Sequence, residues 1–341
     1  MAEALAAAAL FGVATPAAKL LLPGTGALAL AALLYVGAGV GLAAIGLARR
    51  MLGGATREAT LRRADLAVLA GVVLFGGVVA PVLLLLGLER LPASEASLLL
   101  NLETPLTVLL AVALFGEHAG LRVVTGTALV VLGGVMLGDG ATQAGGRWGG
   151  TALVVAACLC WAIDNNLTQR LSLRDPIAVA RWKTLAAGAI NLALALAAGQ
   201  PMPAMPRLAV ALIVGMVSYG VSIALAVRAM AALGAARQAT LFAVAPFVGA
   251  AVSVPLLGER VDLLGGATMA AGVVLLLRER HEHQHAHEPF EHDHLHVHDA
   301  HHDHEHTGVA DVREPHSHPH RHAPLSHAHP HVSDVHHRHR H

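Results

Sequence analysis

The chain is dominated by apolar runs, each about 20 residues long. A helix of that length crosses roughly 30 Å of hydrocarbon, and one soluble core could not bury so many such helices. We therefore predict an all-α integral membrane protein with ten spanning helices. They are expected at about 2–22, 26–48, 65–88, 94–115, 120–138, 148–170, 177–198, 206–232, 236–257 and 261–277.

The composition separates this apolar body from a different C-terminal region. The chain is 55% apolar and 13% charged, yet 23 of its 24 histidines lie in 281–341. The body carries a formal charge of +6 and the histidine-rich region −6. Without long apolar runs, residues 279–341 cannot bury a core, so we predict a disordered tail. This composition suggests a lipid-bilayer partner for the body and no nucleic-acid partner.

Arginine placement predicts how the helices are oriented. Positive residues are retained in the cytoplasm, and twelve arginines lie on one side of the predicted helices against four on the other. Both termini are therefore expected in the cytoplasm, at the inner membrane. The larger set is Arg49, Arg50, Arg57, Arg62, Arg63, Arg122, Arg170, Arg174, Arg228, Arg237, Arg278 and Arg280; the smaller is Arg90, Arg147, Arg207 and Arg260.

An internal repeat divides the body into two units, 1–140 and 147–278. The fourth predicted helix and its exit read LPASEASLLLNLETPLTVLLAVALFGEHAG, and the ninth reads LGAARQATLFAVAPFVGAAVSVPLLGERVD. Both contain a proline, Pro105 or Pro246, and both end in Gly-Glu. Because each unit has five crossings, the second enters the membrane inverted, as in many secondary transporters.

These features resemble the EamA family of the drug/metabolite transporter superfamily. The resemblance covers about 1–277 and rests on the ten helices, the two inverted units, the two prolines and the two Gly-Glu pairs. It implies that a small solute is carried by alternating access, without indicating which solute. The histidine-rich tail departs from the family pattern.

Polar residues within the fourth helix are the first candidates for a substrate pathway. Pro105 has no N–H, so the Asn101 carbonyl loses its helical partner next to the Glu103 carboxylate. Such polar breaks occur at membrane depth where they line a cavity. The alternative is that Glu103 only bonds to a neighbouring helix.

The sixth helix supplies the second group of candidates. Helical spacing places Trp161, Asp164, Asn165 and Thr168 on one face, where they could bind solute or join helices. Lys19 is a further pathway candidate because an ionised residue at membrane depth costs about 2.5–3.5 kcal/mol. Two other cations, at positions 181 and 183, are expected to extend to the cytoplasmic surface.

The tail is predicted to bind Ni, Co or Zn, because neutral imidazole is a good ligand for these ions. A pH-sensitive polyelectrolyte and drifted low-complexity sequence are the alternatives. The candidate ligands are His281, His283, His285, His287, His292, His294, His296, His298, His301, His302, His304 and His306.

We conclude from the sequence that the chain is a carrier and not an enzyme. There is no Gly-Lys pair and hence no Walker A loop, and the H-E-x-x-H string at 281–285 arises by chance in a histidine tract. No cofactor is required, and a homodimer is left open. The alternatives are a transition-metal carrier that uses the tail as donor or sensor, and a membrane-anchored metal-storage or sensing protein.

Overall fold

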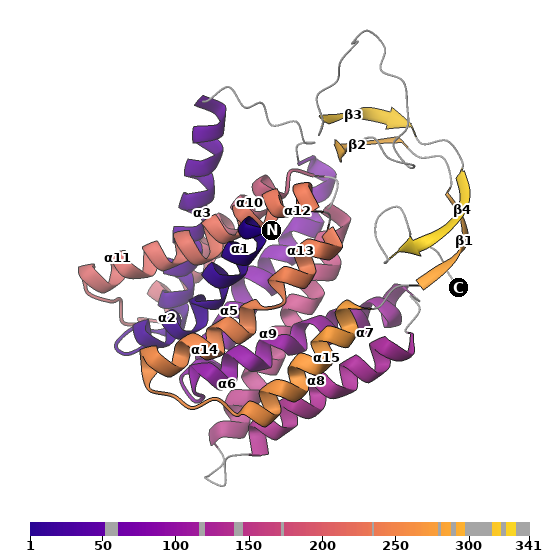
Figure 1. The fold of residues 1–341 in the computed structure, drawn as a ribbon. Helices are drawn as coiled ribbons and strands as arrows, with labels where there is room; N and C mark the ends of the chain where they lie inside the picture. The colour runs from indigo at the N-terminus through magenta and orange to yellow at the C-terminus, as the bar shows by residue number, and fades with distance from the viewer. Residues whose placement is uncertain are drawn as a thin grey trace.

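The computed structural model has an all-helical body followed by short strands (Figure 1). It describes residues 1–51, 61–115, 120–139, 146–171, 174–233, 235–278, 281–287, 291–296, 316–321 and 325–331. Each of the ten predicted segments coincides with helix. Seven helical stretches of the described chain are long and apolar enough to cross a membrane, and Leu121–Leu137 and Leu263–Leu277 are shorter apolar helices. The number of crossings therefore stays a prediction.

The helices fall into two consecutive sets. The first comprises α1 (Ala2–Gly12), α2 (Ala14–Leu21), α3 (Ala27–Met51), η1 (Arg63–Asp65), α4 (Leu66–Val72), η2 (Val73–Val79), α5 (Ala80–Leu88), α6 (Ala93–Leu99), η3 (Leu100–Leu102), α7 (Glu103–Phe115) and α8 (Leu121–Asp139). The second comprises α9 (Gly146–Thr168), η4 (Gln169–Leu171), α10 (Pro176–Ala197), α11 (Met205–Val214), η5 (Gly215–Val221), α12 (Ser222–Leu233), α13 (Ala235–Phe242), α14 (Ala245–Leu257) and α15 (Leu263–Leu277).

Both proline-containing helices are interrupted just before their proline. In the first set α6 ends at Leu99, a 3₁₀ turn follows, and α7 begins at Glu103, two residues before Pro105. In the second set α13 ends at Phe242 and α14 begins at Ala245, with Pro246 in its first turn. A proline is tolerated in the first turn of a helix because the N–H that it lacks would have no partner within the helix there. Each break therefore lies where the position of its proline predicts it.

Two π-helical segments lie within corresponding helices of the two sets. Segment η2 has the sequence VLFGGVV and η5 has GMVSYGV, and each joins two α-helices without a loop. A π-helical turn inserts an extra residue and shifts the carbonyls out of the regular ladder. The Gly76 and Gly77 carbonyls of η2 accept side-chain hydrogen bonds from other helices.

Glycines allow helices of the two sets to approach closely. A Cβ atom at Gly37 of α3 would overlap the backbone of Leu212, and one at Gly215 of η5 would overlap the backbone of Leu34. At the contact between α1 and α14, a Cβ atom at Gly12 of α1 would overlap the backbone of α14, and one at Gly249 of α14 would overlap the backbone of α1. Close backbone approach through small residues is how helices pack within membranes, since lipid leaves little hydrophobic driving force.

Four short strands occur in the histidine-rich tail. They are β1 (His281–His287), β2 (Glu291–His296), β3 (His316–Arg321) and β4 (Leu325–His331). Strand β1 pairs with β4, and β2 with β3, both antiparallel. The pairing concerns these four segments alone, and the disorder of the tail as a whole stays a prediction. Histidine alternating with a second residue has the period of two that suits a strand.

Candidate functional site: a cavity between the two helical sets

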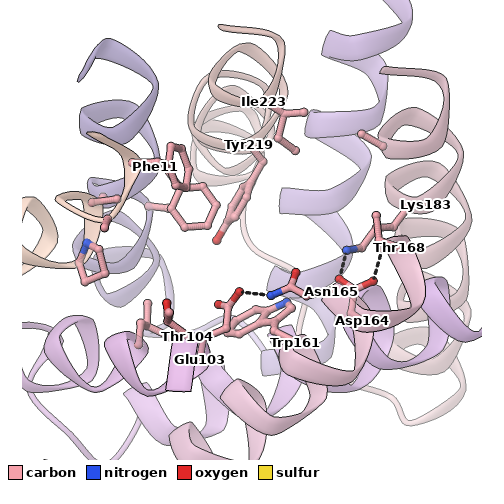
Figure 2. Close-up of a pocket in the computed structure, with 18 of the residues that line it drawn as sticks. Phe11, Glu103, Thr104, Trp161, Asp164, Asn165, Thr168, Lys183, Tyr219 and Ile223 are labelled. Atoms are coloured by element: carbon pink, nitrogen blue, oxygen red, sulfur yellow. Dashed lines mark hydrogen bonds and ion pairs between the residues drawn. The ribbon is translucent and has the colours of Figure 1, made fainter. Parts of the chain in front are cut away.

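A cavity of about 560 Å³ lies among the helices and is lined by both sets. Its polar and aromatic residues come from α1, α2, α3, α6, the η3–α7 junction, α9, η4, α10, η5 and α13 (Figure 2). They are Phe11, Thr15, Tyr35, Ser97, Asn101, Glu103, Thr104, Trp161, Asp164, Asn165, Thr168, Gln169, Lys183, Thr184, Tyr219 and Phe242. Of the pathway candidates from the sequence, Asn101, Glu103, Asp164, Asn165 and Thr168 are brought together here.

Glu103 lies at the first position of α7, where the break in the helix brings it to the cavity wall. Its Oε1 accepts a hydrogen bond of 2.8 Å from Nδ2 of Asn165, and the same amide lies 3.3 Å from Oγ1 of Thr107. Asn101, two residues earlier, donates its own amide to the carbonyl of Leu98 at 2.9 Å. The carboxylate of Glu103 thus accepts a hydrogen bond from the neutral amide of Asn165 and also faces the cavity.

Asp164 and Lys183 form an ion pair on another wall of the cavity. The Asp164 side chain is only 4% exposed and that of Lys183 is 21% exposed. Oγ1 of Thr168 donates to the other carboxylate oxygen of Asp164 at 3.2 Å. The predicted position of Lys183 at the cytoplasmic surface is therefore wrong. Lys183 points inward because its ammonium group neutralises a carboxylate that burial would otherwise leave uncompensated.

The π-helical segment η2 supports both groups. A Cβ atom at Gly76 would overlap the Asp164 carboxylate, so the ion pair packs directly on this glycine. The carbonyl of Gly76 accepts hydrogen bonds from the Tyr35 hydroxyl at 2.8 Å and from Nε1 of Trp161 at 3.1 Å. One displaced carbonyl therefore fixes two aromatic side chains of the cavity wall.

Aromatic side chains are concentrated at this cavity. The sequence has six Phe, three Trp and two Tyr, and five of these eleven residues line it. The ring of Phe11 lies 5.5 Å from that of Tyr219 and 5.2 Å from that of Phe242, and Tyr219 lies 6.0 Å from Tyr35. Figure 2 shows Phe11 and Tyr219 across the space from Glu103 and Trp161, with the Tyr219 hydroxyl directed inward. The sequence analysis missed four of the five; the signal available to it was the small number of aromatic residues in the chain.

The cavity extends to one end of the helical bundle, and we call this end the open end. Its lining there includes Gln169, Leu171 and Pro176, around the connection from α9 to α10, and Met230 near the end of α12. The connection from α9 to α10 is one that the arginine pattern assigns to the cytoplasm.

The opposite end, which we call the closed end, is joined by hydrogen bonds between the two sets. Both carboxylate oxygens of Glu259 accept from the first amides of α6, from Ala93 at 2.9 Å and Ser94 at 2.7 Å. Oγ of Ser94 donates to the carbonyl of Arg260 at 3.1 Å. The carboxylate of the second Gly-Glu pair therefore caps a helix of the first set.

Two further contacts hold the closed end. Oε1 of Gln200 accepts from the amides of Leu28 and Ala29 at 2.9 and 3.3 Å. Nη1 of Arg207 donates to the carbonyl of Pro23 at 2.6 Å. The structure thus has a cavity that reaches one end and a network of inter-set bonds across the other.

Lys19 lies near the closed end and does not line the cavity. Its ammonium group donates to the carbonyls of Leu88 and Leu91, the latter at 2.9 Å. These carbonyls are at the end of α5 and in the connection that follows it. The structure therefore separates Lys19 from the five other pathway candidates and gives it a role in holding a helix end.

None of the described residues that line this cavity is a predicted metal ligand of the tail. His298, His301, His302, His304 and His306 lie outside the described residues, as do the side chains of the seven candidate histidines in β1 and β2. Among the residues that the structure describes, no group of three histidine, cysteine or acidic residues is placed to hold a metal ion.

Comparison with known proteins gives two sequence matches. The chain matches the EamA-like transporter family over residues 2–138 and again over 148–278. It is 32% identical over 231 residues to an uncharacterized transporter of Methanothermobacter thermautotrophicus (strain Delta H). That alignment covers 64% of this chain and 66% of the relative, slightly under two thirds of the relative's length.

A crystal structure of a protein with 21% sequence identity has a similar fold. The similarity covers 80% of this chain and 94% of that protein, with a TM-score of 0.56. It concerns the arrangement of the helices alone.

Proposed function

The chain belongs to the EamA-like transporter family, and from this premise we propose that it is a secondary carrier of a small solute that works by alternating access. It is a multi-pass membrane protein, and the proposed orientation puts both termini and the open end in the cytoplasm of the cell. The body of the chain carries the solute, and no enzymatic step is required.

The observation that supports alternating access most directly is the asymmetry of the cavity. Charged and aromatic groups of both helical sets face a space that reaches one end, while hydrogen bonds between the sets join the other. The separate family matches to the two halves fit a pair of related units. An inverted pair can exchange its open and closed ends by rocking one unit against the other.

A solute panel tests the carrier proposal. Cells that overproduce the chain and cells with an empty vector are loaded with labelled metabolites, toxic analogues and transition metals, and the retained label is measured. We expect at least one solute to differ in accumulation between the two strains. Equal accumulation of every class of solute, with the protein present in the membrane, would oppose the proposal.

The tail is proposed as a cytoplasmic accessory that captures or senses Ni, Co or Zn. In support, the strand register places histidine opposite histidine at six positions, such as His281 with His331 and His294 with His318. The alternatives remain a transition-metal carrier with the tail as donor or sensor, and a membrane-anchored storage or sensing protein.

Deleting residues 281–341 should separate transport from metal binding. The truncated protein should still insert and move its solute, because the helical body is intact, while binding of nickel, cobalt or zinc by the purified protein should disappear. Binding to the full chain should also weaken below about pH 6, where protons compete for imidazole. Equilibrium dialysis measures the binding. An unchanged metal stoichiometry after truncation would contradict the proposed role of the tail.

A further inference from the structure

The cavity has one more carboxyl group than it has ammonium groups among its described lining residues. Within the described lining, three side chains end in a carboxyl or ammonium group: Glu103, Asp164 and Lys183. The last two neutralise each other as an ion pair, and no ion pair of the described residues involves Glu103. Its one direct side-chain partner, Asn165, contributes a neutral amide. When Glu103 is ionised, its charge is therefore left to be balanced by a cation that enters the cavity.

Electron-rich ring faces surround the same space. Phe11, Tyr219 and Phe242 form a contiguous aromatic group, and Trp161 lies next to Glu103 (Figure 2). An ammonium group within about 6 Å of such a ring is attracted by its quadrupole, by about 2 kcal/mol or more when water is excluded. The rings cover the alkyl groups of an organic cation, while the carboxylate neutralises its charge.

We propose that this cavity binds a solute bearing an organic ammonium group, an inference that rests on the proposed carrier function. The ammonium group lies between the carboxylate of Glu103 and the rings of Phe11, Trp161 and Tyr219. An anionic solute fits less well, because the one lysine that lines the described cavity is already bound to Asp164. A volume of about 560 Å³ suits a small molecule rather than a peptide segment.

Two probes that differ only in charge test this inference. Choline and 3,3-dimethylbutan-1-ol have the same shape, with nitrogen in the first replaced by carbon in the second. Titration calorimetry of the purified full chain in detergent micelles should give at least tenfold tighter binding of choline. Glu103→Gln should remove most of that preference, and Tyr219→Leu should weaken choline binding, whereas Tyr219→Phe, which keeps the ring, should retain it.

Glu89→Gln is the matched control, because it removes the same charge from an exposed residue at the end of α5. It should bind choline like the unmodified chain, and every variant should elute from a sizing column as the unmodified chain does. Equal affinity for the two probes, or tighter binding of 3,3-dimethylbutyrate than of choline, would overturn the ammonium assignment. Those results would leave the carrier proposal in place, because alternating access is measured separately by labelling from the two membrane faces.

Discussion

Replacing Lys183 with methionine should lower the free energy of unfolding by about 3–5 kcal/mol, because the buried carboxylate of Asp164 loses its partner. The Asp164 side chain is 4% exposed and packs against Gly76, so its carboxylate is largely removed from water. Titration with sodium dodecyl sulfate in mixed micelles measures the change. The double variant Asp164→Asn/Lys183→Met should recover much of the loss, because it removes both charges together.

An exposed ion pair supplies the control for this experiment. Arg228 and Glu3 are joined at 2.8 Å, but their side chains are 60% and 39% exposed. Arg228→Met should therefore change the free energy of unfolding by no more than about 1 kcal/mol. If Lys183→Met unfolded at the same detergent fraction as the unmodified chain, Asp164 would not depend on Lys183 for its charge balance.

Glu103→Gln should reduce solute transport at least about tenfold, equivalent to about 1.4 kcal/mol in the barrier. The glutamine oxygen can still accept the hydrogen bond from Asn165, so the protein should insert and accumulate normally. Only the negative charge facing the cavity is removed. Initial rates of uptake or export of the solute identified by the panel, at matched protein abundance, measure the effect.

Glu89→Gln is again the appropriate comparison, because Glu89 is exposed and outside the cavity lining. Its transport rate should equal that of the unmodified chain. A Glu103→Gln variant that transported at the full rate would mean that the carboxylate charge takes no part in the solute pathway.

The helical architecture could be predicted from sequence because its signals are local. Run length sets each helix, and the positions of Pro105 and Pro246 set the two breaks, since a proline removes one backbone donor wherever it occurs. Glu103, Asp164 and Asn165 could be selected because ionisable and amide groups are costly at membrane depth. Each of these arguments concerns one segment at a time.

Other features of the site depend on contacts between distant helices. Lys183 lies in an early turn of α10, where a cation can reach the membrane surface, and only its contact with α9 reveals that it turns inward. The aromatic group joins residues from α1, η5 and α13, so sequence spacing could not bring it together. The separation of Lys19 from the other pathway candidates could not be predicted for the same reason, because the carbonyls that hold it belong to another part of the bundle.

Labelling of one cysteine from each membrane face tests alternating access most directly. With Cys158 and Cys160 replaced by alanine, Thr104→Cys places a thiol on the cavity wall beside Glu103 (Figure 2). A membrane-impermeant maleimide should reach it in both inside-out and right-side-out vesicles, because each state opens one face.

A second sample also carries Ser94→Cys and Arg260→Cys. A short bifunctional methanethiosulfonate joins these two thiols across the closed end, where Ser94 already contacts residue 260. We predict that this link abolishes labelling from the outer face and leaves labelling from the cytoplasmic face. Labelling of the unlinked protein from one face alone would contradict alternating access.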